Sequence, residues 1–250
     1  MPKTYKLLEN VPTIYQSEGK FDLALADLRT MSDISSTRDF FFARRLFGKS
    51  HPISMHGSYQ AEDIIYIPDT PRIILIVDRR YSPILKDPKG VAKPNRKGLH
   101  YHISSDEALS LMKIAKENPE EAIESGVLLV PIDKIPCKFL PIDDMISYEI
   151  SLSKFTKHPV PRFLIRDQAE QSAKFLGENR IKSVPFYIYP VYYVKAQKQP
   201  FANKLWIDRL DKSSGFDGYN SSLGIYSWIC GVNNLPSQSE EALENLVQRV

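Results

Sequence analysis

The stretch AEDIIYIPDTPRIILIVDRR, residues 61–80, decides the expected fold. It contains two apolar runs, 64–67 and 72–77, joined by the sequence Pro68-Asp69-Thr70-Pro71. Proline and aspartate favour a tight turn, and the second run is too apolar for a strand that faces solvent. The pattern therefore predicts a β-hairpin whose second strand lies in the interior of a sheet.

Charged residues stand at the ends of both predicted strands. Folding the hairpin at its turn sets Asp63 opposite Ile76, which makes Asp63 and Asp78 diagonal neighbours on one face, roughly 7–8 Å apart at the backbone. Arg80 lies two residues beyond Asp78 and so points to the same face. Because two carboxylates at this separation can bind one divalent cation, the sequence predicts a metal site at the strand ends.

The order of these charges resembles the metal site of the PD-(D/E)xK nuclease superfamily, in which an acid on one strand is followed by an acid, any residue and a cation on the next. The resemblance implies a restriction-endonuclease-like core and a Mg²⁺-dependent endonuclease that hydrolyses phosphodiester bonds. In that role Asp63 and Asp78 bind Mg²⁺ with the carbonyl of Arg79, and Arg80 holds the scissile phosphate and the attacking water. The sequence departs from the pattern at Glu62, where the family has proline, and at Arg80, where it has lysine.

Length and composition predict an α+β protein with a central mixed sheet flanked by helices. The chain has 250 residues, 42% of them hydrophobic, and its 18 prolines, 11 glycines and 11% aromatic residues favour short strands with rigid connections. The expected division is an α/β core over residues 1–157 and a C-terminal extension over 158–250, packed on the same core. Two cysteines are too few for a disulfide framework, and no signal peptide or membrane-spanning run is evident, so a cytoplasmic protein is expected.

Basic charge is concentrated directly after the hairpin. Residues 79–97 contain seven Lys or Arg and one Asp, although the formal net charge of the whole chain is only +3. Prolines and glycines predict a loop over 81–98, which in a nuclease would close over the phosphate backbone. Nucleic acid, DNA more than RNA, is the expected partner, and a homodimer is compatible with the pattern. The residues expected to contact nucleic acid are Lys86, Lys89, Lys93, Arg96 and Lys97.

Three other interpretations remain open. The paired motifs beginning at His56 and His102 resemble those of metal-free 2H phosphoesterases, which implies that one histidine acts as base and the other as acid on a phosphodiester. His100 and His102 share one face of a strand, as a zinc pair does, but no third ligand stands at a telling spacing, so core or surface histidines flanked by tyrosine are expected instead. The last alternative is a non-enzymatic nucleic-acid-binding or assembly subunit in which the hairpin is only a scaffold.

Local patterns predict further elements along the chain. Apolar spacing and capping residues indicate helices over 21–31, 38–47 and 104–118. Apolar runs indicate strands over 51–59 and 127–132. The proline-rich segment 156–161 is the expected boundary between the two parts of the chain.

Overall fold

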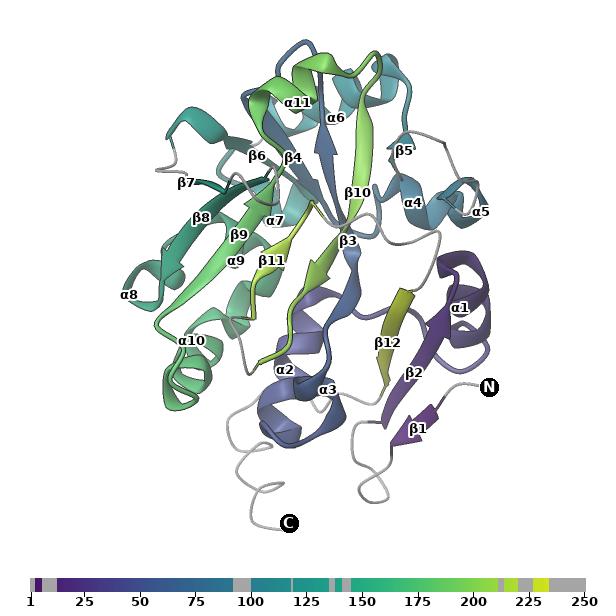
Figure 1. Cartoon of the computed structure of the whole chain (residues 1–250), viewed down its shortest axis with the longest axis vertical. Helices are drawn as coiled ribbons and strands as arrows, with labels where there is room; N and C mark the ends of the chain where they lie inside the picture. Colours follow the sequence, from purple (N-terminus) through teal and green to yellow (C-terminus); the bar gives the residue numbers. More distant parts are fainter. Residues whose placement is uncertain are drawn as a thin grey trace.

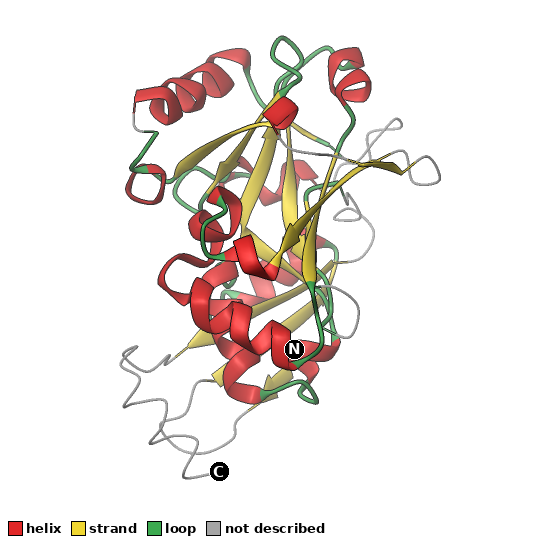
Figure 2. Cartoon of the chain, turned by 90° about the vertical axis from the view of Figure 1, so that its left-hand side faces the viewer, coloured by secondary structure: helices red, strands yellow, loops and turns green. Residues whose placement is uncertain are grey.

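The computed structural model describes residues 3–5, 13–91, 100–117, 119–134, 138–140, 145–210, 214–219 and 227–233. These residues form a large mixed sheet with helices packed against it, so the predicted α+β class is confirmed (Figures 1 and 2). None of the helices described is long and apolar enough to cross a membrane.

The predicted hairpin is present and is central to the sheet. Strand β3 (Ser58–Tyr66) pairs in antiparallel fashion with β4 (Ile73–Val77), and nearly every residue of both strands is buried. The register differs from the expected one by a single residue, because Asp63 pairs with Val77 instead of Ile76. A shift of one residue moves a side chain to the other face of a sheet, so this small error changes which residues meet.

Strand β3 has neighbours along both edges. On one edge it pairs along its length with the antiparallel strand β10 (Phe201–Ile207). On the other edge it contacts β12 (Ser227–Asn233) near its start and β4 near its end, and β4 in turn pairs with β6 (Val127–Pro131). Strands from both sides of residue 157 thus lie in one sheet, and the proposed division of the chain stays a prediction.

The remaining strands extend the sheet on both sides of β3 (Figure 1). Beyond β12 follow β2 and β1, and beyond β10 follow β11, β9, β8 and β7, while β5 pairs with the start of β10. Their bounds are β1 Lys3–Tyr5, β2 Thr13–Gly19, β5 Tyr101–His102, β7 Lys138–Leu140, β8 Met145–Ser151, β9 Ser183–Ile188 and β11 Phe216–Asp217.

Alternate residues of the hairpin face two different hydrophobic cores. Even-numbered residues such as Ile64 and Ile76 pack in one cluster with helices α2 (Thr37–Phe47), α9 (Pro159–Ile165) and α10 (Ala169–Glu178). Odd-numbered residues such as Ile65 and Val77 pack in the other with α1 (Phe21–Leu28) and α6 (Ser105–Glu117). Full burial of one such side chain contributes about 1.5–3 kcal/mol, so the two cores hold both faces of the hairpin firmly.

Several short helices occupy segments that the sequence patterns assigned to other structures. The expected strand over 51–59 begins with helix α3 (Pro52–Met55), the expected loop over 81–98 contains α4 (Pro83–Lys86) and α5 (Pro88–Val91), and α9 starts inside the expected boundary over 156–161. The bounds of the other short elements are α7 Ala122–Ser125, α8 Leu152–Phe155, α11 Val191–Ala196 and two 3₁₀ turns, Ile132–Lys134 and Arg166–Gln168.

Proline explains these differences. Helices α3, α4 and α9 each carry a proline in the first turn, directly after a capping residue. His51, Ser82 and His158 each accept a hydrogen bond from a backbone N–H of that first turn. Since proline has no N–H to lose there and its φ angle suits a helix, it begins these helices instead of breaking them.

Candidate functional site

Asp63, expected to bind a metal ion, lies in a fully buried ion pair. Lys204 is its direct partner across strands β3 and β10, and Lys204 Nζ lies 2.7 Å from Asp63 Oδ1, with both side chains at 0% exposure. Burial lowers the pKa of Lys204, and the charge of Asp63 opposes this shift. Nζ also donates to the carbonyl of Ala61 and to Ser82 Oγ. Asp63 is therefore enclosed by protein groups and cannot form part of an open site.

Asp78 lies on the opposite face of the sheet from Asp63. It directly follows β4, and the observed register sets Asp63 beside Val77, so Asp78 points away from it. The carboxylate of Asp78 accepts hydrogen bonds from Arg80 Nη2 at 2.7 Å and from Arg166 Nη2 at 3.5 Å. The predicted site shared by Asp63, Asp78 and Arg80 is therefore not formed. The cause is the one-residue difference in register.

A cavity of about 530 Å³ opens on the Asp78 face. Extending the register of β3 and β4 by one residue sets Glu62 opposite Asp78, and both side chains line this cavity. The other polar lining residues come from the start of α2, the segment after β4, α7 and the end of α9. They are Ser36, Arg38, Asp39, Arg79, Arg80, Glu124 and Arg166. We call this cavity the arginine pocket.

Glu62 is the buried acid of the arginine pocket. Its carboxylate accepts hydrogen bonds from the backbone N–H of Thr37, at 3.1 and 3.2 Å, and from Thr37 Oγ1 at 2.9 Å, so it binds the N-terminal end of α2. Burial at 4% exposure raises the pKa of Glu62 to about 7, although the bonds from Thr37 and the charge of Lys204 oppose the rise. The sequence singles out Glu62 only as a departure from a nuclease pattern and does not predict its place in this pocket.

Most guanidinium groups around the pocket are already engaged. Arg80 binds Asp78 and donates to the carbonyls of Ile123 and Glu124. Arg38 forms a bidentate ion pair with Asp167. Arg79, whose carbonyl was expected to bind Mg²⁺, donates from its side chain to Asp33 and to the carbonyl of Ile34. Arginine forks of this kind fix carboxylates in place.

Arg166 differs from these neighbours. Within the described part of the chain, the single hydrogen bond of its guanidinium group is the 3.5 Å bond to Asp78. The residue ends α9 with φ 59° and ψ −129°, a conformation that is costly for a residue other than glycine. Arg166 thus lines the pocket from a strained backbone position, and most N–H groups of its guanidinium form no hydrogen bond with the described residues.

Gly126 is required beside the Asp78–Arg80 pair. Its φ is +75°, and a Cβ atom there would lie 2.5 Å from Arg80 Nη2 and 2.9 Å from Asp78 Oδ2. We expect Gly126→Ala to lower the free energy of unfolding by about 1–3 kcal/mol, measured by urea denaturation, because it adds backbone strain and displaces the ion pair. Gly177→Ala in α10 is the matched control, since its Cβ would meet only an ordinary contact at 3.7 Å. We expect that change to be neutral or stabilising.

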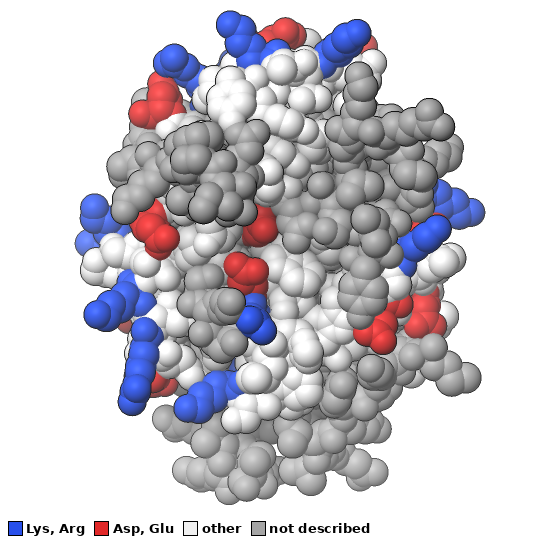
Figure 3. Space-filling view, in the orientation of Figure 1, with Lys and Arg blue, Asp and Glu red and all other residues white. Residues whose placement is uncertain are grey.

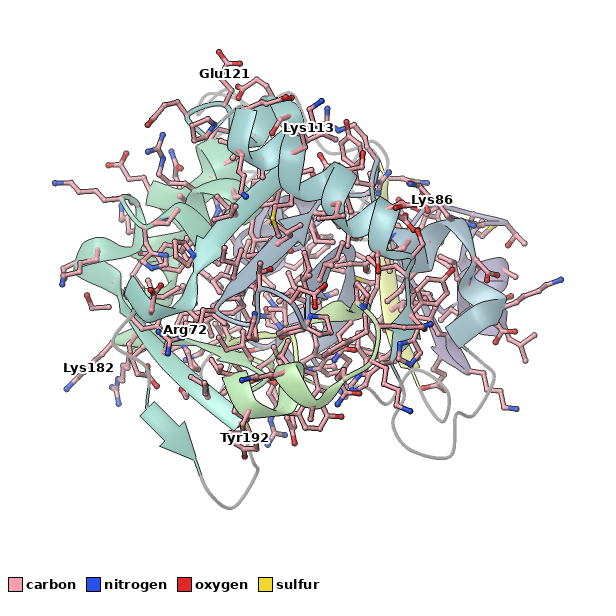
Figure 4. All side chains as sticks on the ribbon, turned by 90° about the horizontal axis from the view of Figure 1, so that it is seen from above. Arg72, Lys86, Lys113, Glu121, Lys182 and Tyr192 are labelled. Carbon is pink, nitrogen blue, oxygen red and sulfur yellow. The ribbon has the colours of Figure 1, made fainter. Side chains whose placement is uncertain are left out.

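The residues expected to contact nucleic acid are only partly described. Lys86 and Lys89 are exposed, on α4 and α5, and Lys86 is labelled in Figure 4. Lys93, Arg96 and Lys97 lie outside the described residues. On the face shown in Figure 3, the basic and acidic side chains of the described residues are interspersed. This view gives no support to a continuous basic surface.

The histidine alternatives do not form sites. His102 lies beside Phe201 at the start of β10, whereas His56 precedes Ser58, which pairs with Ile207 at the other end of that strand. Seven residues of strand span roughly 20 Å, too far for two histidines to act on one phosphodiester. The ring nitrogens of His100 lie 3.1 Å from Asn203 Oδ1 and 2.7 Å from Tyr193 Oη, which agrees with the expected histidine beside tyrosine and not with half of a zinc pair.

The described residues also give no basis for the expected Mg²⁺ site. No group of three or more His, Cys, Asp or Glu among them is placed to hold a metal ion. Asp78, the predicted carboxylate ligand that lines the pocket, faces two guanidinium groups. Carboxylates already neutralised by arginine are poor ligands for a hard cation. Mg²⁺ binding stays an untested prediction, and the described residues offer it no site.

Comparisons with known proteins give a structural relationship alone. No protein-family model and no curated protein matches the sequence. A solved structure from Nanoarchaeota, in which the C-type lectin fold accommodates massive sequence variation, is similar with a TM-score of 0.61 and 13% identity. The match covers 88% of this chain and 97% of the nanoarchaeal one. The expected relationship to PD-(D/E)xK nucleases and the nuclease function were therefore wrong, and a restriction-endonuclease-like core is not confirmed. The chain has a fold similar to the C-type lectin fold.

Proposed function

We propose that this chain is a binding protein that takes a small ligand carrying a carboxylate or phosphate group into the arginine pocket. The observation that carries the proposal is Arg166, which lines a cavity of about 530 Å³ and whose guanidinium group forms, among the described residues, one long hydrogen bond. Planar guanidinium groups bind carboxylate and phosphate oxygens through paired hydrogen bonds. The ligand would supply the acceptors that Arg166 lacks.

The lining of the pocket also carries the acids Asp39 and Glu124, so Arg166 is the residue that favours one small anion. Arg38, Arg79 and Arg80 are each matched by a carboxylate, so they contribute little attraction of their own. Glu62, with a pKa of about 7, carries less than a full negative charge near neutral pH and repels an anion only weakly. Among its described lining residues, the pocket thus combines Arg166, which shares Asp78 with Arg80, with a buried acid that can become neutral.

The structural relative fits a binding role. In the nanoarchaeal protein the fold accommodates massive sequence variation. A scaffold that keeps its core while other residues change is suited to recognition, because binding residues can change without loss of the fold. In the present chain, residues at the ends of helices and strands line the arginine pocket, and these helices and strands pack in two buried apolar clusters.

Calorimetric titration with inorganic phosphate and, separately, with acetate tests the proposal, with chloride at equal ionic strength as reference. We expect Arg166→Gln to weaken binding of the preferred anion about 10- to 100-fold, because a hydrogen bond to a charged group contributes about 1.5–3 kcal/mol. Arg162→Gln is the control, since Arg162 lies one turn earlier on α9 and outside this pocket.

The two titrations distinguish a phosphate from a carboxylate site. Equal affinity of the wild-type protein and Arg166→Gln for both anions would contradict the proposal. So would the absence of any heat of binding above the chloride reference in the wild-type protein. An equal loss in the Arg162 variant would point to a general effect of charge.

A further inference from the structure

We propose that Lys204 and Asp63 react with each other to form an isopeptide bond that joins strands β10 and β3 covalently. This modification would be independent of ligand binding, because neither residue lines the arginine pocket. The argument rests on the placement of the two groups, on the hydrogen-bond donors around the carboxyl group, and on the fit of the product to its surroundings.

The reacting groups are held together in a site without water access. Lys204 and Asp63 are direct partners in the β3–β10 pairing, and Nζ lies 2.7 Å from Oδ1 with both side chains at 0% exposure. Their face of the sheet is the apolar cluster that contains Ala61, Ile65 and Ile84. Groups held in this way react with effective concentrations of about 10⁵–10⁸ M when the geometry is favourable.

The second carboxyl oxygen of Asp63 faces two hydrogen-bond donors. Ser82 Oγ donates to Oδ2 at 2.5 Å, and the backbone N–H of Ile84 donates to the same atom at 3.2 Å. Ser82 is fixed in turn because its Oγ accepts from the N–H of Leu85 at the start of α4. Two preorganised donors at one oxygen are what stabilises the negative charge that develops when a nucleophile attacks a carbonyl carbon.

The reaction balances without another reactant. Transfer of one proton within the ion pair gives a neutral amine and a neutral carboxylic acid. Nζ of Lys204 then bonds to Cγ of Asp63, and an electron pair of the carbonyl group moves onto Oδ2, next to Ser82 and Ile84. A proton passes from Nζ to Oδ1, the Cγ–Oδ1 bond breaks, and Oδ1 leaves as water. The products are one amide and one water molecule.

The surrounding groups fit the amide that would result. Its N–H has an acceptor in the carbonyl of Ala61, which lies 2.8 Å from Nζ. Its carbonyl oxygen, the present Oδ2, keeps both donors, Ser82 Oγ and the Ile84 N–H. Every polar atom of the new bond therefore has a partner, as buried polar atoms require.

Burial also favours the reaction. Two charges in a site of low polarity are costly even when they are paired, and conversion to an amide removes both of them. Burial lowers the pKa of Lys204, which raises the share of the neutral amine that acts as nucleophile. The amide thus takes the place of the ion pair, and unlike the ion pair it carries no buried charge.

Mass spectrometry of the intact, denatured protein tests the proposal. The wild-type chain should have a mass about 18 Da below the value calculated from its sequence, since one water is lost. Tryptic digestion should yield one linked species made of residues 50–72 and 199–209, with no cleavage after Lys204. A wild-type mass equal to the calculated value would overturn the proposal, as would the same loss of mass with the two peptides unlinked.

Two lysine variants provide a matched comparison. Lys204→Arg keeps the positive charge but lacks the amine nucleophile, so its mass should equal the value calculated for its own sequence. Lys195→Arg alters an exposed lysine on α11 and should retain the loss of one water. Loss of water in Lys204→Arg would also overturn the assignment. The wild-type measurement decides the question even if Lys204→Arg does not fold.

Discussion

Replacing Arg44 with leucine is expected to lower the free energy of unfolding by about 3–5 kcal/mol, a large share of the stability of an ordinary domain. Arg44 lies on α2 at 0% exposure and donates to the carbonyls of Ile53, His56 and Asp208 and to Ser214 Oγ. Leucine fills part of the space but leaves these buried acceptors without their donor, at a cost of about 1–3 kcal/mol each.

A buried cation has its own cost, and that cost limits the predicted effect. No carboxylate forms a direct ion pair with Arg44 among the residues described, and burial lowers the pKa of Arg44 to about 9. Replacing Arg44 also removes the desolvation cost of a buried cation. The expected decrease in the free energy of unfolding is therefore smaller than the summed cost of the acceptors that lose their donor. The ring of Phe40, 4.3 Å from the guanidinium carbon, stabilises the cation as well.

Arg45 provides the control for this experiment, because it lies next to Arg44 on the same helix. Its guanidinium carbon lies 5.4 Å from the ring centroid of Phe42, and its Nη1 is buried without a hydrogen bond among the described residues. We expect Arg45→Leu to change the free energy of unfolding by less than about 1 kcal/mol. Urea denaturation of both variants measures the difference. Equal effects would show that the hydrogen bonds of Arg44 contribute little.

Arg44 also illustrates why the sequence predicts the elements of this fold better than its sites. Its helix was predicted within one residue, because the phenylalanines of α2 recur at helical spacing and Gly48 ends the helix. Nothing in the sequence indicates that Arg44 points inward. The acceptor Ser214 is 170 residues from Arg44 in the sequence, and the two residues meet only when β10 pairs with β3.

The candidate site was missed for a related reason. The pattern of apolar residues predicts the hairpin of β3 and β4, with residues 64–67 as the first strand where the structure has Ser58–Tyr66. Pairing strength differs little between neighbouring registers of two apolar strands, so the expected register depends on the turn. That register is wrong by one residue. The expected register therefore makes Asp63, a buried structural acid, a metal ligand, and it assigns no role to Glu62, which lines the pocket.

The pH dependence of stability tests the role of Glu62. The pKa of Glu62 is about 7 in the folded chain, above its ordinary value of 4.5, so the folded state holds the proton more tightly than the unfolded state. Stability is therefore highest below about pH 4.5 as far as Glu62 is concerned, and it falls by about 3 kcal/mol as the pH rises through 7. Above that pH the contribution is constant.

Glu62→Gln removes this dependence without removing the contacts. The glutamine oxygen accepts from the N–H of Thr37, and its amide group donates to Thr37 Oγ1, so the N-terminal end of α2 stays capped. We expect the variant to equal the wild-type protein near pH 5 and to exceed it by about 2–3 kcal/mol at pH 8, measured by urea denaturation at each pH. The variant is thus expected to be more stable than the natural chain.

Taking the difference between variant and wild type at each pH isolates Glu62. His158 has a pKa lowered to about 4 by burial, so its contribution is lost as the pH falls and opposes the slope due to Glu62. Because both proteins contain His158, its contribution cancels. Glu124→Gln, a change at an exposed acid that lines the same pocket, should leave the wild-type slope in place. A Glu62→Gln profile parallel to the wild-type profile between pH 5 and 8 would show that Glu62 is ionised throughout this range. The arginine pocket would then contain a permanent negative charge, which would weaken the case for an anionic ligand.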